Sequence, residues 1–273
     1  MSRAREVDLV STLRIGGVDV LVEGRGATTI VMLHGWPDTL RLWDAQVAAL
    51  KTNFRCVRFT LPGFEPETPR VACSLDDTVA LLRDVANTVS PDRPVVLLLH
   101  DWGCFFGYQF AMREPRRVAR IVGVDIGDSG SPEHVRSLSA KAKAMLVAYQ
   151  SWLALAWRIG GRAGDAMTRG FARAAHAPAD ASSIHSGMNY PYDIRWAGSH
   201  GSYRHAAAFV PNWPMLFMYG SRKPFMFHSP AFAAALAARA DCRVVEFDTG
   251  HWVMSEQPQR FNEALDDWLA VEA

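Results

Sequence analysis

An apolar run that ends at an acidic residue and continues as a helix pattern constrains this chain more than any other stretch. Val95 to Leu98 has the continuous apolar character of a strand buried on both faces, and Phe105 to Met112 carries apolar residues at helical spacing. A strand therefore passes almost directly into a helix, with Asp101 at the corner. A corner of this kind holds one side chain above the end of a sheet, at the positive end of a helix.

Asp101 has a simpler interpretation as a helix N-cap, because an aspartate before a helix accepts a hydrogen bond from an unpaired backbone N–H. Two further motifs favour a chemical role instead. The first, His34-Gly35-Trp36-Pro37, follows the apolar run 30–33, and the second, Gly250-His251-Trp252, follows the run 244–247. Each motif is weak alone, but the three in this order supply the parts of a catalytic centre.

Strand and helix patterns alternate along most of the chain. Two strand-like runs around Gly16-Gly17 predict an antiparallel hairpin, and Ser74-Leu75-Asp76-Asp77 resembles a capping box that starts a helix. Strands are predicted at 13–15, 18–22, 30–33, 54–59, 95–98, 118–124, 215–219 and 243–247, and helices at 40–50, 75–89, 105–112, 230–239 and 258–269. This alternation is typical of a mostly parallel sheet with helices on its faces.

The alternation breaks between about residues 129 and 211, where no strand-like run occurs. Helical stretches rich in large apolar residues take its place, followed by a segment from Tyr190 to Trp196. We expect a helical insertion, and most of its tryptophans are expected to build the insertion's own small core.

With these motifs in place, the chain resembles the α/β-hydrolase superfamily, and within it the branch with an aspartate nucleophile, the epoxide hydrolases and haloalkane dehalogenases. His34-Gly35-Trp36-Pro37 resembles the oxyanion-loop motif of that branch, His100-Asp101-Trp102-Gly103 its nucleophile motif, and Gly250-His251-Trp252 its catalytic-base motif. The resemblance implies an α/β fold with a mostly parallel sheet flanked by helices. It divides the chain into a hydrolase core of residues 1–129 and 212–273 and a helical cap of residues 130–211, inserted after the sixth strand.

The resemblance assigns a two-step reaction to these motifs. Asp101 is ionised at neutral pH, so it attacks a saturated carbon without help from a base and forms an alkyl ester of the enzyme. His251 then activates the water that hydrolyses the ester, and the backbone N–H groups of Trp36 and Trp102 hold the developing oxyanion. The sequence thus predicts a hydrolase of small apolar substrates, with epoxide hydrolysis to a vicinal diol as the leading activity.

The acid that orients His251 departs from the commoner pattern of the family. Most relatives carry an aspartate after the strand that here is 215–219, yet residues 220–228 contain no carboxylate. Some relatives place the acid after the preceding strand, where this chain has Asp125 and Asp128. We predict Asp125 as the orienting acid, with Asp128 as the second choice.

Epoxide opening also needs a proton donor for the leaving oxygen, and epoxide hydrolases use tyrosines of the cap. Tyr190 and Tyr192 are the candidates, with Tyr149 and Tyr203 behind them, although tyrosines that only pack around Pro191 explain this segment about as well. A dehalogenase would instead bind the departing halide through indole N–H groups, which Trp36 and Trp102 can supply. The residues expected to line the substrate pocket are His34, Trp36, Trp102, Tyr149 and Trp152.

Three hypotheses about function follow. The leading one is an epoxide hydrolase, the second is a haloalkane or haloacid dehalogenase of the same branch, and the third is a non-catalytic, ligand-binding relative. The missing acid in residues 220–228 and the bulky Leu99 at the start of the corner favour the third hypothesis. The joint presence of Asp101 and His251 argues against it, because a binding protein needs neither.

Composition narrows the expected partners. The chain has 29 Lys+Arg against 28 Asp+Glu, so nothing favours binding to nucleic acid or to an anionic membrane. It contains no apolar run of about 18 residues, and Met1 to Glu6 lead into no secretory core, so we expect a cytoplasmic protein. Cys56, Cys73, Cys104 and Cys242 lack the paired spacing of zinc or redox centres. We therefore expect reduced thiols, no metal or other cofactor, and a monomer or homodimer.

Overall fold

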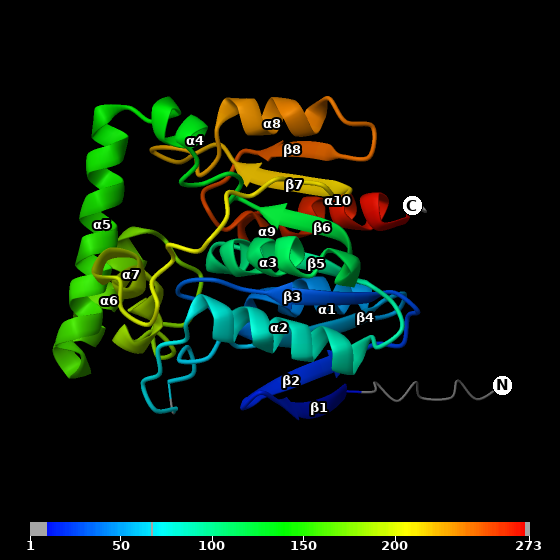
Figure 1. Ribbon diagram of the computed structural model, residues 1–273, viewed down its shortest axis with the longest axis horizontal. Helices are drawn as coiled ribbons and strands as arrows, with labels where there is room; N and C mark the ends of the chain where they lie inside the picture. Colours follow the sequence, from blue (N-terminus) through cyan, green and yellow to red (C-terminus); the bar gives the residue numbers. More distant parts are fainter. Residues whose placement is uncertain (1–9, 67, 271–273) are drawn as a thin grey trace.

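The computed structural model describes residues 10–66 and 68–270, so the prediction drawn from Met1 to Glu6 lies outside the described residues. Within them, eight strands form one sheet in the order β1-β2-β4-β3-β5-β6-β7-β8 (Figure 1). The first two are antiparallel to their neighbours, and the other six are mutually parallel. This confirms the predicted mostly parallel α/β fold. The strands are β1 (Val10–Ile15), β2 (Val18–Glu23), β3 (Thr29–Leu33), β4 (Arg55–Phe59), β5 (Val95–His100), β6 (Val118–Val124), β7 (Met215–Gly220) and β8 (Arg243–Phe247).

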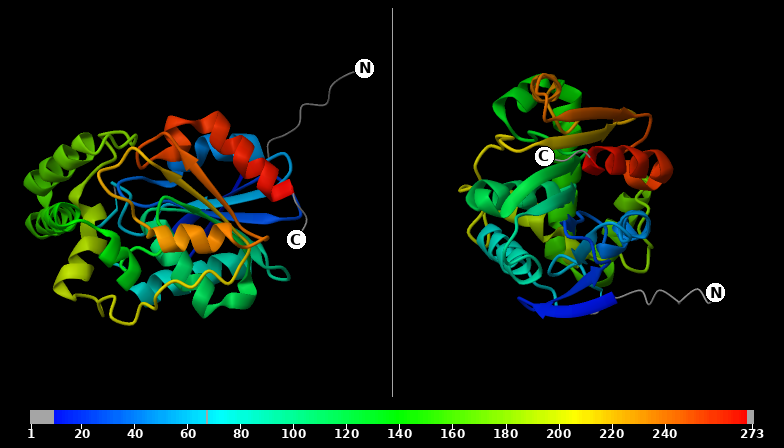
Figure 2. Two further views of the ribbon diagram at one scale, coloured as in Figure 1. Left: turned by 90° about the horizontal axis from the view of Figure 1, so that it is seen from above. Right: turned by 90° about the vertical axis from the view of Figure 1, so that its right-hand side faces the viewer.

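Helices cover both faces of the sheet, and Figure 2 shows these two layers on opposite sides. One face carries α2 (Leu75–Val89), α3 (Trp102–Arg113) and α8 (Pro230–Ala237), and the other carries α1 (Asp44–Leu50), α9 (Val253–Glu256) and α10 (Pro258–Ala270). Along β3, Val31 points into the first layer and Met32 into the second. Because successive strand residues alternate between two buried faces, the parallel strands appear in the sequence as continuous apolar runs.

The start of α2 agrees with the sequence-based prediction, whereas the start of α1 differs from it. At the start of α2 the predicted capping box is present, with the Asp77 backbone N–H donating to the Ser74 hydroxyl at 3.1 Å. The helix predicted at 40–50 instead begins with a 3₁₀ turn, Leu40–Trp43, before α1. The carbonyl of Leu40 accepts a hydrogen bond from the Arg58 guanidinium at 3.1 Å, which draws it away from α-helical bonding. The prediction of one continuous helix was wrong in this detail.

Between β6 and β7 the chain forms helices and loops. The helices are α4 (Pro132–Ser137), α5 (Ala140–Ile159), α6 (Gly161–Ala174) and α7 (Tyr190–Ala197), with a 3₁₀ turn at Ser186–Asn189. Figure 1 shows α5, α6 and α7 beside the carboxyl ends of the central strands, the edge at which parallel α/β sheets place their functional residues. We refer to residues 130–211 as the insertion. None of the helices in the described ranges is long and apolar enough to cross a membrane.

Candidate active site

Asp101 stands at the corner between β5 and α3, which we call the elbow. Its φ of 50° and ψ of −123° form a backbone conformation that residues other than glycine rarely adopt. The side chain makes no capping hydrogen bond to α3. One carboxylate oxygen, Oδ1, instead accepts the backbone N–H of Trp36 at 2.7 Å. The elbow therefore presents Asp101 to the loop of residues 34–38 after β3, which we call the oxyanion loop.

The elbow and the oxyanion loop approach closely because Gly35 has no side chain. A Cβ at that position would lie 2.4 Å from Asp101 Oδ1 and 2.5 Å from the Trp102 nitrogen. A second glycine makes room for the bulky residue before the elbow, since a Cβ at Gly107 would lie 2.5 Å from the Leu99 side chain. Leu99 is thus accommodated, and it no longer favours a non-catalytic relative.

His251 lies in the loop after β8, between two carboxylates. Its Nε2 is 3.5 Å from Asp101 Oδ2, and its other ring nitrogen, Nδ1, hydrogen-bonds to the carboxylate of Asp125. Asp125 follows β6, is fully buried, and also accepts the backbone N–H of Gly220 at 3.1 Å. Asp101, His251 and Asp125 were predicted from separate stretches of sequence, and the structure places them together with His251 in the middle.

Asp128, the second choice for the acid, is engaged elsewhere. Its carboxylate accepts the backbone N–H and the hydroxyl of Ser229 and the hydroxyl of Ser131, each at 2.7 Å. These bonds fasten the loop after β6 to the start of α8. Among the described residues no hydrogen bond joins Asp128 to His251, so the geometry favours Asp125.

Lys223 is a member of this cluster that the sequence reasoning missed. Its Nζ donates to the Asp125 carboxylate and to the carbonyl of Gly220, and its side chain is only 6% exposed. It lies in the loop after β7, where the family resemblance leads one to expect the acid. A lysine in a loop is normally solvent-exposed, so the sequence alone does not indicate that Lys223 is buried. The only signal was the absence of a carboxylate from residues 220–228.

The charges of the cluster determine its protonation. Burial alone would raise the pKa of both carboxyls and lower that of the imidazole, because charged groups lose their hydration. Their mutual attraction outweighs burial: His251 lowers the pKa of Asp101, and His251 with Lys223 lowers that of Asp125 to about 2. Asp125 and Asp101 in turn raise the pKa of His251 to about 9. At neutral pH two carboxylates therefore face one imidazolium.

Two buried histidines support the loops. His34 donates from Nδ1 to the carbonyl of Gly35 and accepts the backbone N–H of Leu61 at Nε2, both at 2.9 Å. His100 donates from Nε2 to the carbonyl of His251 at 3.1 Å. Burial lowers the pKa of His34 to about 4 and that of His100 to about 3, so both are neutral. We expected His34 to line the substrate pocket, but it does not line the cavity described next. Its hydrogen bonds instead join the loop after β3 to the loop after β4.

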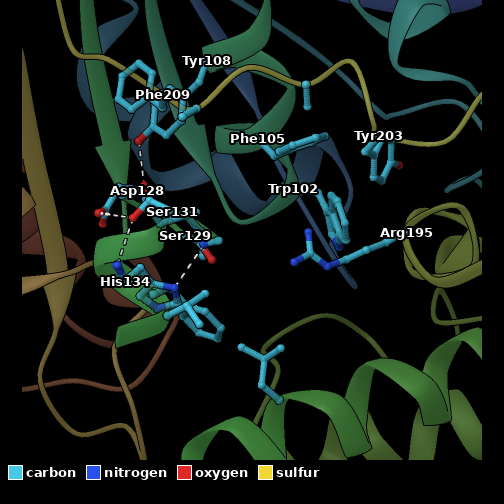
Figure 3. Close-up of a pocket in the computed structure, with 18 of the residues that line it drawn as sticks. Trp102, Phe105, Tyr108, Asp128, Ser129, Ser131, His134, Arg195, Tyr203 and Phe209 are labelled. Carbon is cyan, nitrogen blue, oxygen red and sulfur yellow. Dashed lines mark hydrogen bonds between the residues drawn. The ribbon is translucent and has the colours of Figure 1, made fainter. Parts of the chain in front are cut away.

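A cavity of about 650 Å³, lined in part by Asp101, lies between the sheet edge and the insertion. Figure 3 shows much of its wall. Trp102 and Tyr149, both expected at the pocket, line it. Much of its wall is apolar, formed by side chains that include Phe105, Ile126, Leu138, Leu146, Phe209 and Phe227. Within residues 10–66 and 68–270, no group of three or more His, Cys, Asp or Glu side chains is placed to hold a metal ion.

Tyr190 and Tyr192 point in opposite directions, because residues two apart on an α-helix are turned by about 200°. Tyr192 lines the cavity, edge-on to Trp102 with 5.2 Å between ring centroids. Tyr190 is fully buried against Phe64, and its hydroxyl has no hydrogen-bond partner among the described residues. The structure thus places Tyr192 at the cavity and Tyr190 away from it, and the two further candidates, Tyr149 and Tyr203, also line the cavity.

Two tryptophan side chains expected at the pocket lie outside it. The indole N–H of Trp36 donates to Asn189 at 2.7 Å, and Asn189 donates to the Thr168 hydroxyl at 2.8 Å. Trp36 therefore offers the site its backbone N–H alone. Trp152 is 46% exposed on α5, and its indole N–H donates to the carbonyl of Met167 in α6 at 3.2 Å. The packing of the insertion helices, which the local sequence does not reveal, decides which side chains face the cavity.

Known proteins resemble this chain in sequence. A family model described as "Alpha/beta hydrolase family" matches residues 30–264. The chain is 31% identical over 127 residues to "Probable oxidoreductase EphD" of Mycobacterium tuberculosis, which covers 44% of this chain and 21% of that protein. It is 28% identical over 105 residues to "Epoxide hydrolase 1" of Caenorhabditis elegans, which covers 37% of this chain and 26% of that protein. The matches thus span 21% and 26% of these two curated relatives.

Solved structures resemble it over nearly its whole length. A variant of an epoxide hydrolase from Bacillus megaterium has a TM-score of 0.72 at 20% identity, covering 96% of this chain and 100% of that chain. A loop variant of the haloalkane dehalogenase DbeA from Bradyrhizobium elkanii has a TM-score of 0.66 at 18% identity, covering 97% of each chain. At such identities the likeness shows that the fold is shared.

Proposed function

This chain belongs to the alpha/beta hydrolase family, and from that premise we propose that it hydrolyses an epoxide to a vicinal diol through a covalent ester on Asp101. One observation carries the proposal: the Asp101 carboxylate lies in the cavity between the backbone N–H of Trp36 and an imidazole whose other nitrogen bonds to Asp125. Relatives named epoxide hydrolases support this choice of reaction. We also assign residues 130–211 as the cap over the cavity.

In the first step the Asp101 carboxylate attacks a carbon of the epoxide ring. Its lowered pKa keeps it ionised, and the Trp36 N–H holds Oδ1, which leaves Oδ2 to form the new C–O bond. The ring C–O bond breaks, and the leaving oxygen keeps the electron pair and needs a proton. Because a carboxylate attacks without a base, His251 is reserved for the second step.

Three tyrosines with candidate donor hydroxyls line the cavity, and we assign Tyr192 and Tyr149 rather than Tyr203 to this oxygen because the charge of Asp101 acts on both. Both line the cavity, and burial raises the pKa of each, with Asp101 adding to the rise. Both hydroxyls are therefore protonated in the free enzyme. A phenol beside the leaving oxygen stabilises it by a hydrogen bond and then by transfer of the proton.

We expect Tyr192→Phe to slow ester formation roughly tenfold to a few hundredfold, as loss of other leaving-group and oxyanion donors does. Ester hydrolysis should change less, because the donor acts in the first step. Rapid-quench measurement of ester and diol separates the two rates.

Tyr190→Phe is the matched control on the same helix. Its hydroxyl has no partner in the described part of the chain, so its removal should leave both rates within about twofold. Equal losses in the Tyr190 and Tyr192 variants would contradict the assignment of the donor.

In the second step, water attacks the ester carbonyl and His251 takes its proton. Esterification removes the negative charge of Asp101 and with it part of the attraction that raises the pKa of His251. The imidazolium can then give its proton to the phenolate left by the first step, which restores the tyrosine and leaves a neutral base. The carbonyl oxygen develops its negative charge beside the Trp36 N–H. When the C=O bond re-forms, the ester C–O bond breaks, and the leaving alkoxide takes the proton of the new carboxyl group to give the diol. Asp101 is then ionised again, and His251 holds the proton taken from water.

Lys223, through Asp125, adjusts the pH at which His251 works. A cation behind Asp125 disfavours the imidazolium, so its removal raises the pKa of His251. Because His251 must be neutral to act, we expect the acidic limb of the kcat profile of Lys223→Met to move up by about one pH unit. Lys223→Arg keeps the charge and should keep the profile. An unshifted limb in a folded Lys223→Met protein would contradict this role.

Product analysis separates the epoxide hydrolase from the alternatives. A dehalogenase would use the same three residues but would need donors for a halide, and the Trp36 indole already bonds to Asn189. We expect diol from phenyl glycidyl ether or styrene oxide. Halide release from 1-bromobutane or chloroacetate, with no diol from any epoxide, would assign a dehalogenase. Neither product would favour the ligand-binding relative.

A further inference from the structure

We propose that Arg195 binds an anionic group on the substrate, so that the substrate class of this site is an apolar epoxide that bears a carboxylate. The inference rests on the proposed function, because it concerns the cavity at Asp101. It adds a specificity-determining residue that no motif of the sequence indicated.

Arg195 lines the cavity from α7, three residues after Tyr192. Residues three apart share a helix face, with Cβ atoms about 5–6 Å apart, so Arg195 and the proposed proton donor face the same space. In Figure 3 the Arg195 side chain extends past Trp102 toward the middle of the cavity. A Cβ on Gly130, elsewhere on the wall, would lie 3.8 Å from its Nη2. The guanidinium therefore reaches across the cavity.

The carboxylates of the cavity wall already have partners. Asp101 faces the Trp36 N–H and His251, and Asp128 accepts its hydrogen bonds from two serines. The amides of the wall are also engaged, Gln109 with the backbone of Ala207 and Gln150 with the side chains of Tyr149 and Trp196. Both carboxylates and both amides of the wall therefore already have partners other than Arg195 and Lys143.

The cations of the wall have no such partners. Arg195 and Lys143 are exposed residues at the open part of the cavity wall, and their side chains make no ion pair or hydrogen bond with any residue that the structure describes. The acid on the same helix as Arg195, Asp193, is taken by Arg158 at 2.6 Å and by the hydroxyl of Ser199 at 3.0 Å. The unused charge of the cavity is therefore positive, and an anionic ligand complements it.

A guanidinium is well suited to a carboxylate, since its planar N–H groups form two parallel hydrogen bonds with the two oxygens. Burial raises the pKa of Tyr149 and Tyr203, and the charge of Arg195, on the same cavity wall, opposes that rise. Because Arg195 is about one helical turn from Tyr192, the carboxylate should lie roughly 5–10 Å from the epoxide oxygen. Lys143, on the same wall, adds attraction for an anionic substrate.

A matched pair of substrates tests the proposal: phenyl glycidyl ether and the same ether with a carboxylate para on its ring. We expect wild-type kcat/KM to be about tenfold or more higher for the acid, through a lower KM. Arg195→Met should remove this preference, and Arg195→Lys should keep part of it. Lys141→Met, an exposed position on α5 outside the cavity, is the charge-matched control and should leave both substrates unaffected.

Equal kcat/KM for the two ethers in wild type, or the same preference in Arg195→Met as in wild type, would overturn the proposal. Diol formation from the neutral ether in either case would leave the proposed function standing. If neither ether gives diol, binding tests the site without turnover. Titration of 4-methoxybenzoate and of neutral anisole into the Asp101→Asn protein should show tighter binding of the acid, weakened about tenfold by adding Arg195→Met. Equal affinity of that double variant for the acid would overturn the proposal independently of the reaction.

Discussion

In the proposed reaction we expect His251→Gln to stop turnover after the first step and to leave the substrate carbon bonded to Asp101. Glutamine keeps a polar side chain but cannot take a proton from water, whereas the Asp101 carboxylate still attacks. We expect ester hydrolysis to slow by roughly a thousandfold or more, as when the base of a comparable catalytic centre is removed. After incubation with phenyl glycidyl ether, the intact mass should rise by one epoxide, and peptide mapping should place the adduct on Asp101.

Asp101→Asn is the control for this experiment, because it preserves the size of the side chain and removes the ionised oxygen. Neither this variant nor its combination with His251→Gln should carry the adduct. If the His251→Gln protein stayed unmodified while wild type produced diol, or if the adduct mapped to another residue, covalent chemistry at Asp101 would be excluded.

We expect Asp125→Asn to lower turnover by roughly a hundredfold to ten-thousandfold while the protein stays folded, by analogy with the acid of other catalytic triads. The Asp125 carboxylate bonds to His251 Nδ1, and an amide in its place can present an N–H and turn the imidazole into the wrong tautomer. Loss of the negative charge also lowers the pKa of His251, because Asp125 is the strongest of the groups that raise it. The acidic limb of kcat should therefore move to lower pH, opposite to its movement in Lys223→Met.

Asp128→Asn is the matched control for the acid. Its carboxylate bonds to Ser131 and Ser229, so we expect a small loss of thermal stability and turnover within about threefold of wild type. Inactivity of Asp128→Asn together with normal turnover of Asp125→Asn would move the role of the acid to Asp128.

Much of the sheet could be predicted because strands buried on both faces leave a strong local signal. β6 and β8 occupy the residues predicted for them, 118–124 and 243–247, and the break in the pattern correctly located the helical segment that follows β6. A contact between distant residues leaves no such signal. The hydrogen bond from Arg58 to the carbonyl of Leu40 changed the start of one predicted helix, and nothing in residues 40–50 indicates it.

The candidate site also has a part that the sequence predicts and a part that it does not. Asp101, His251 and Asp125 each follow a predicted strand, and parallel strands end at one edge, so their proximity follows from the pattern. The side chains of the insertion depend on how α5, α6 and α7 pack together. For that reason the sequence did not distinguish Tyr192 from Tyr190, and it placed the exposed Trp152 at the pocket.

The buried hydrogen bond between Asn189 and Trp36 ties the insertion to the oxyanion loop. Trp36 also holds Asp101 through its backbone N–H, so lifting the insertion at this point would dismantle the anion-binding geometry. An unsatisfied buried polar group is costly, which keeps the Asn189 end closed. The two contacts of Trp36 therefore couple the insertion to the elbow, and loss of the Asn189 side chain would loosen both at once.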